Sequence, residues 1–139
     1  MKKICICTTV SITMKTFVVE TAKYLHENCG YDITLICNED EKFEKSLPEY
    51  LHFIPVHMAR GIDLSALKSI KQFMQIFKEH KFDMVQYSTP NAACYASIAA
   101  KRAKVPVRLY CQWGIRYVGM SGISRKIFKA IEKMVCRNS

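Results

Sequence analysis

The 139-residue chain is poor in glycine and has no glycine-rich phosphate loop. It contains 5 glycines, and none of them lies in the segment 8–13 that follows the first hydrophobic run. A dinucleotide-binding fingerprint needs glycines at that point, because the backbone must approach the pyrophosphate closely. The pattern GxxxxGK[ST] does not occur either. We therefore do not expect a dehydrogenase-like, flavodoxin-like or P-loop domain, and we expect no cofactor.

Clustered metal ligands and self-contained catalytic sets are also missing. The 7 cysteines form no CxxC pair, and the 4 histidines are scattered along the chain. A zinc site would need such residues close together, so no metal site is predicted. The cysteines are interpreted as small buried side chains of a protein in a reducing cytosol. No paired carboxylates, Ser-His-Asp set or HExxH motif indicates a complete catalytic apparatus.

Acidic residues are outnumbered, 12 against 21 basic ones, which gives a net charge of +9. This balance suits an anionic partner, such as a lipid surface, a phosphorylated substrate or a nucleic acid. The basic residues are spread over several predicted helices and no nucleic-acid motif appears, so we do not expect a nucleic acid. No run of 18 apolar residues exists to span a membrane. The length favours one domain over residues 1–139.

One strand–helix–strand unit over Phe82–Tyr110 organises the chain. A short strand is predicted over 83–87, and Thr89 and Pro90 are suited to cap and begin a helix. The helix carries alanines at a spacing that lets it lie close on a sheet. Val105-Pro106 ends the helix, and a second strand follows over 107–110. Two strands joined in this way are expected to be parallel with a right-handed crossover.

The remaining segments alternate in the same manner. Strands are predicted over 3–8, 31–37 and 51–56. Helices are predicted over 14–28, after residue 63 and over 124–137, with a loop or frayed helix over 38–49. Asp63 is expected to cap the second helix, with Ile62 packing on Leu67. The buried stripe of that helix is predicted to comprise Leu64, Leu67, Ile70, Met74 and Phe77. This order predicts an α/β, Rossmann-like three-layer sandwich with a mostly parallel sheet.

Ligands of such sheets bind outside the carboxyl ends of the strands, and three loops meet at that edge. In the first loop, the hydroxyls of Thr9, Ser11 and Thr13 are candidates to bind a sugar-like acceptor, although they could equally cap the helix. In the loop after residue 87, Ser88, Thr89 and Asn91 lie at a helix N-terminus, where an anion can bind. Ordinary capping is the competing interpretation of those three residues.

The third loop follows the last strand and holds Gln112, Trp113, Gly114 and Arg116. Trp113 is the single tryptophan of the chain. An indole beside an arginine and a glutamine suits a sugar ring, an apolar lipid segment or a partner domain. The alternative is that Trp113 covers the edge of the core while Arg116 is solvated.

The last predicted helix carries Lys126, Lys129, Lys133 and Arg137 broadly on one side. Such a basic face can rest on an anionic membrane surface. A solvated basic face, with no partner, is the alternative.

Segments 2–40, 51–110 and 114–139, taken in order, resemble the N-terminal domain of GT-B fold glycosyltransferases of the family 4 type, found in bacterial capsular and exopolysaccharide synthesis. The resemblance implies transfer of a sugar from a nucleotide-sugar donor to a saccharide or lipid-linked saccharide acceptor, by a cytoplasmic enzyme on the inner face of the plasma membrane. The N-terminal domain would hold the acceptor, and a C-terminal domain absent from this chain would bind the donor.

Two departures limit what the resemblance implies. Similar sequences often carry a histidine where this chain has Trp113, so no role of that histidine carries over, and the catalytic residues stay unassigned. The paired-glutamate donor motif has no counterpart here, so we expect no activity from the chain alone. The competing hypothesis is a non-enzymatic α/β module that binds an anionic partner, such as a nucleic acid or a phosphorylated ligand.

Overall fold

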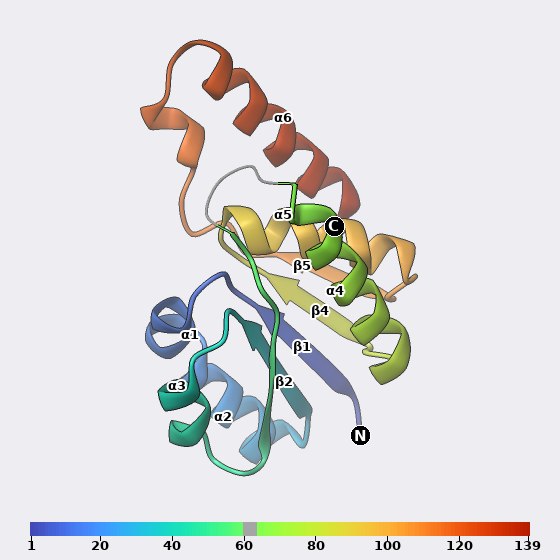
Figure 1. Cartoon of the computed structure of the whole chain (residues 1–139). Coiled ribbons are helices and arrows are strands. Elements are labelled where there is room, and N and C mark those ends of the chain that lie inside the picture. The colour runs from blue at the N-terminus through green and yellow to red at the C-terminus, as the bar shows by residue number, and fades with distance from the viewer. Residues whose placement is uncertain (60–63) are drawn as a thin grey trace.

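Five parallel strands form the central sheet of the computed structural model, in the order β3-β2-β1-β4-β5 (Figure 1). The structure describes residues 1–59 and 64–139. The strands are β1 (Lys3–Cys7), β2 (Asp32–Cys37), β3 (Leu51–Pro55), β4 (Met84–Tyr87) and β5 (Val107–Tyr110). The helices are α1 (Ser11–Phe17), α2 (Val19–Cys29), α3 (Glu41–Ser46), α4 (Ala66–His80), α5 (Pro90–Arg102) and α6 (Gly122–Asn138), with a 3-10 helix, η1, over Arg116–Gly119. The predicted α/β sandwich is confirmed, and every strand pair is parallel.

The central strand, β1, pairs with β2 on one side and with β4 on the other. Its side chains alternate between the two faces of the sheet, as those of any strand do. Ile4 and Ile6 pack with residues of α1, α2 and α3, whereas Cys5 and Cys7 pack with residues of α4 and α5. The order of strands reverses between β1 and β4, so the carboxyl ends of these two strands define the crevice where ligands of open α/β sheets bind.

Helix α5 packs closely because one of its faces consists of small residues. Ala92, Ala96, Ala99 and Ala100 are fully buried against the sheet. Helix α4 lies beside α5 and contributes Phe73 and Phe77 to the same cluster. The predicted strand–helix–strand unit is therefore confirmed. Its buried side chains belong to the larger of the two clusters of buried residues in the protein.

The predicted buried stripe of α4 is wrong at its start. Leu64 and Leu67 are 92% and 68% exposed, while Phe73 and Ile76 are buried. The helix begins only at Ala66, so Leu64 precedes it and Leu67 lies in the first turn, beyond the edge of the core. Ser65 occupies the cap position, and the predicted contacts of residues 62 and 63 fall outside the described residues.

The first predicted helix begins earlier than expected and is divided in two. Helix α1 starts at Ser11, and Val18, whose φ of −117° departs from helical values, separates it from α2. Val18 is buried, so its side chain packs into the core at the break. The cysteine prediction needs correction as well, because Cys29 and Cys136 are exposed while Cys5, Cys7 and Cys37 are buried.

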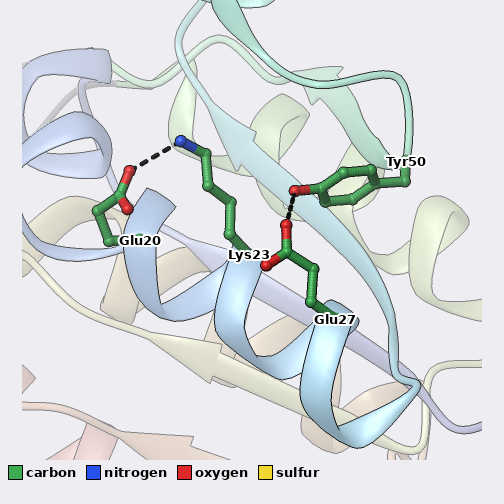
Figure 2. Close-up of polar contacts among 4 residues, drawn as sticks. All are labelled: Glu20, Lys23, Glu27 and Tyr50. Carbon is green, nitrogen blue, oxygen red and sulfur yellow. Dashed lines mark hydrogen bonds and ion pairs between the residues drawn. The ribbon is translucent and has the colours of Figure 1, made fainter.

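Polar contacts on α2 fix the segment that leads into β3 (Figure 2). The Tyr50 hydroxyl donates a hydrogen bond of 2.5 Å to the Glu27 carboxylate, which raises the pKa of Tyr50. The Tyr50 ring also stacks on His26, with ring centroids 4.4 Å apart. Glu20 and Lys23 form an exposed ion pair one turn earlier. An exposed pair of this kind contributes only about 0.3–0.5 kcal/mol, so the ring contact and the Tyr50 hydrogen bond are the main anchors.

Candidate functional site

Two threonines connect the loops that follow β1 and β4. The Thr9 backbone N–H donates to Thr89 Oγ1 over 3.0 Å, and the two hydroxyl oxygens lie 2.8 Å apart. Thr9 Oγ1 also accepts a hydrogen bond from the Ala92 backbone N–H, at 3.3 Å. Thr9 therefore caps α5 from a loop 80 residues away in the sequence. The structure thus brings two predicted site residues into direct contact, at the reversal point of the sheet.

Thr89 occupies the N-cap position of α5, and Pro90 is the first residue of the helix, as predicted. The Thr89 side chain makes no capping hydrogen bond, however, because its hydroxyl is directed to Thr9. Its backbone has a φ of 68° and a ψ of 144°. A β-branched residue rarely adopts positive φ, and such strained backbone persists only where neighbouring contacts hold it. The bonds to Thr9 provide that restraint.

The other hydroxyls of the first loop have different surroundings. Ser11 Oγ donates to the Asp40 carboxylate over 2.5 Å, and the other oxygen of Asp40 accepts from the Phe43 backbone N–H at the start of α3. These hydrogen bonds lower the pKa of Asp40. Thr13, two residues further along α1, lines a pocket instead. Ser11 is thus tied to α3, while Thr13 faces the crevice.

That pocket has a volume of about 440 Å³ and lies between α1, the start of α5 and the loop after β5. Phe17 and Trp113 form one wall, with ring centroids 5.2 Å apart. Trp113 is 45% exposed, so part of the indole is available to a ligand. The residues that line the pocket are Thr13, Phe17, Thr89, Pro90, Tyr110, Trp113, Gly114, Ile115 and Arg116.

Helix α6 holds the loop that carries Trp113. The Arg116 guanidinium lies over the Phe128 ring, 4.8 Å from its centroid. The Glu132 carboxylate accepts hydrogen bonds from the Tyr110 hydroxyl, at 3.1 Å, and from the Gln112 amide. Burial, and then the bond to Glu132, raise the pKa of Tyr110. Sequence reasoning missed Glu132, because nothing in a lysine-rich amphipathic helix marks one glutamate as the partner of a distant loop.

Ser88 and Asn91 are buried and differ in their bonding. Ser88 Oγ has no hydrogen-bond partner among the described residues. The Asn91 amide donates to the Ala59 carbonyl and lies 3.4 Å from the Tyr95 hydroxyl. Neither side chain lines the pocket. Asn91 holds the segment that follows β3 against α5, so a contact of Asn91 with a ligand stays a prediction.

The four predicted basic residues of α6 are all exposed, and they are Lys126, Lys129, Lys133 and Arg137. The C-terminal half of α6 packs through Ile131, Met134 and Val135 on the core, whereas its first turns reach beyond the sheet together with η1 (Figure 1). Ile123 and Ile127, in those first turns, are exposed. In the part of the chain that the structure describes, no helix is both long and apolar enough to cross a bilayer.

No group of three histidine, cysteine, aspartate or glutamate side chains gathers as a candidate metal site within residues 1–59 and 64–139. The chemistry available at the pocket is that of aromatic faces, hydroxyls and one guanidinium. Such a set binds and orients a polar ligand that has an apolar face. It includes no obvious nucleophile or general base.

Comparisons with known proteins bear on the family and the fold of this chain. The family model described as Glycosyl transferase 4-like matches residues 3–139. The capsular polysaccharide biosynthesis glycosyltransferase CapM of Staphylococcus aureus is 29% identical over 104 residues, which cover 74% of this chain and 27% of that protein.

Solved structures share the fold at low sequence identity. The S. aureus MnaA–UDP structure has a TM-score of 0.69 at 18% identity, covering 97% of this chain and 35% of that one. Acinetobacter baumannii MurG gives 0.58 at 17%, covering 94% of this chain and 39% of that one. The UDP-GlcNAc 2-epimerase of Methanocaldococcus jannaschii gives 0.61 at 16%, covering 97% and 37%. The predicted Rossmann-like fold of the GT-B type is confirmed, and the chain spans only about a quarter to two fifths of the length of these relatives.

Proposed function

The chain belongs to the glycosyl transferase 4-like family, and on that premise we propose that it is the N-terminal, acceptor-binding domain of a GT-B glycosyltransferase. The whole enzyme transfers a hexose from a nucleotide-sugar donor to a lipid-linked saccharide in capsular or exopolysaccharide biosynthesis. The observation that carries the proposal is the pocket at the carboxyl edge of the sheet, with Phe17, Trp113 and Arg116 in its lining.

The chemistry of this pocket fits a saccharide. The exposed part of the Trp113 indole offers an aromatic face to the apolar side of a sugar ring, and Phe17 supports the indole from α1. Thr13 supplies a hydroxyl, and Arg116 supplies a cation for a phosphate of a lipid carrier. Gly114 lies between these side chains and leaves open space, since nothing lies within 4 Å of where its Cβ would be.

The remaining predicted residues have supporting roles in this proposal. Thr9 and Thr89 fix the start of α5 beside the pocket. Gln112 is held by Glu132 and sets the path of the loop that carries Trp113. Ser11, Ser88 and Asn91 do not line the pocket, so a direct contact of these residues with the acceptor stays a prediction.

The donor is proposed to bind a second domain outside this chain. Val107 and Leu109 of the edge strand β5 are 51% and 42% exposed, which suits cover by further polypeptide. The lining of the pocket contains no acidic side chain to hold the ribose hydroxyls of a nucleotide. We expect the isolated chain to bind acceptor and to transfer no sugar.

The membrane surface is proposed to meet α6. Lys126, Lys129 and Lys133 project beside the exposed Ile123 and Ile127, which suits a peripheral contact with the anionic inner face of the plasma membrane. Changing the three lysines to glutamate is expected to abolish binding to vesicles that contain phosphatidylglycerol. The control is the same charge change at the exposed lysines 42, 68 and 71. Equal loss in both variants would show only an effect of net charge.

The functional test uses the two-domain enzyme with Trp113→Ala and Arg116→Ala. Each change is expected to raise KM for the acceptor about 10-fold, the equivalent of about 1.4 kcal/mol, and to leave KM for the donor unchanged. Tyr24→Ala is the matched control, since Tyr24 is an exposed aromatic residue of α2 that does not line the pocket. Higher donor KM with constant acceptor KM would contradict the proposal, as would sugar transfer by the 139-residue chain alone.

A further inference from the structure

A second pocket lies at the opposite, amino edge of the sheet, where α4 and α5 end and β4 and β5 begin. Its volume is about 310 Å³. Phe77, Phe82 and Val105 are buried beneath it and give it an apolar floor. Lys78, Lys81 and Lys104 surround it. None of these residues belongs to the crevice described above, so the proposed sugar transfer does not use them.

The positive charge around this pocket is only partly compensated. Within the described part of the chain, the side chains of Lys78, Lys81 and Lys104 form no ion pair and no hydrogen bond. Asp83 is the one acidic residue of the lining, and its carboxylate accepts a hydrogen bond of 2.7 Å from the Lys3 backbone N–H. The carbonyl groups at the ends of α4 and α5 cannot neutralise three ammonium groups, because a helix end carries only about half a charge.

Two of the lysines occupy backbone positions that favour glycine. Lys81 has a φ of 53° and Lys104 a φ of 58°, both in the left-handed region. Lys81 ends α4 in the manner of a C-cap glycine, since its N–H donates to the Phe77 carbonyl. Glycine would adopt these conformations at lower cost. Each site instead carries a long cationic side chain, and both border the same pocket.

We propose that this lysine pocket binds a small organic phosphate, with the phosphate among the three ammonium groups and the organic part on the floor formed by Phe77, Phe82 and Val105. The volume is that of the smaller ligand pockets of proteins and is sufficient for an aryl or glycosyl phosphate. Ammonium groups that donate to a phosphate form charge-assisted hydrogen bonds, which are stronger than neutral ones. The site is independent of the acceptor pocket and lies at the other end of the strands.

The test titrates the ¹⁵N-labelled chain with phenyl phosphate at an ionic strength of about 0.15 M, where nonspecific attraction is screened. Saturable shifts are expected at the amides of Lys81, Phe82 and Lys104, with smaller shifts for inorganic phosphate. The Lys81→Gly/Lys104→Gly variant is expected to weaken binding at least 10-fold, and it should fold, because glycine is favoured at both positions. Lys42→Ala/Lys68→Ala is the control, since it removes the same charge from exposed sites elsewhere.

Three results would overturn the proposal. The first is equal weakening in the glycine variant and the control, which would show a general charge effect. The second is shifts that map to the Arg116 pocket. The third is loss of phosphatidylglycerol-vesicle binding in the glycine variant without any response to phenyl phosphate, which would identify a membrane contact. Lys78→Gln is a second variant that leaves the left-handed positions unchanged, and it too must weaken binding of phenyl phosphate.

Discussion

The contact between Thr9 and Thr89 predicts energetic coupling of the two loops that border the acceptor pocket. Thr89→Val keeps the β-branched shape at the strained position and removes the oxygen that accepts from the Thr9 N–H. Thr9→Val removes the oxygen that caps Ala92. Each change leaves a backbone N–H without its partner, in partly buried surroundings, so we expect a loss of about 1–2 kcal/mol in the free energy of unfolding.

The two changes remove one shared bond, the 2.8 Å contact between the hydroxyls. The double variant should therefore lose about 0.5–1.5 kcal/mol less than the sum of the single losses. A chain of 139 residues has an unfolding entropy of about 0.3 kcal/mol/K, so a loss of 1.5 kcal/mol lowers Tm by about 5 °C. Urea unfolding followed by circular dichroism measures all four proteins of the cycle.

A matched control is Thr16→Val. The Thr16 hydroxyl donates only to the Ile12 carbonyl within the exposed face of α1, so the change should alter the unfolding free energy by less than about 0.5 kcal/mol. Additive losses at Thr9 and Thr89, with a coupling below about 0.3 kcal/mol, would refute the reasoning. The two loops would then be positioned independently of each other.

Three further predictions concern titration and reactivity. The pKa of Tyr110 is raised on folding, so its neutral form stabilises the protein below pH 10, and this stability is lost as the pH rises towards the folded pKa. Tyr110→Phe should therefore make the alkaline decline of the unfolding free energy shallower in urea titrations, and an unchanged decline would contradict the bond to Glu132. The pKa of Asp40 is lowered, so its contribution to stability is present above pH 4 and is lost on acidification. Asp40→Asn and Ser11→Ala should therefore both reduce the fall of Tm at acidic pH. An unchanged fall would contradict the hydrogen bonds that Asp40 accepts from Ser11 and Phe43. A thiol reagent at pH 8 should modify Cys29 and Cys136 rapidly and the three buried cysteines only after unfolding. Two further cysteines are partly exposed, so fast reaction of more than four of the 7 thiols would contradict the burial of Cys5, Cys7 and Cys37.

The strands and the strand–helix–strand unit could be predicted because their signals are local. A short apolar run, a proline that can begin a helix and a row of alanines each restrict the backbone within a few residues. The division at Val18 could not be predicted in this way, since it depends on how one side chain packs in the core. The exposure of Leu64 and Leu67 depends likewise on where α4 begins relative to the sheet.

The location of the site in the fold could be predicted from the sequence, but the contacts among its side chains could not. Parallel strands bring their carboxyl ends together, so the loops with Thr9, Thr89 and Trp113 were expected at one edge, and the pocket lies there. Which hydroxyl faces the crevice depends on the start of α1. This helix directs Ser11 to Asp40 and leaves Thr13 in the pocket.

The most direct test of the central claim is to locate the acceptor on this chain by amide shift mapping with a soluble analogue of a lipid-linked saccharide. The account predicts saturable shifts at Thr13, Phe17, Trp113, Gly114 and Arg116, and their loss in Trp113→Ala. Shifts confined to other surfaces, or equally strong binding by Trp113→Ala, would contradict an acceptor site at the carboxyl edge of the sheet.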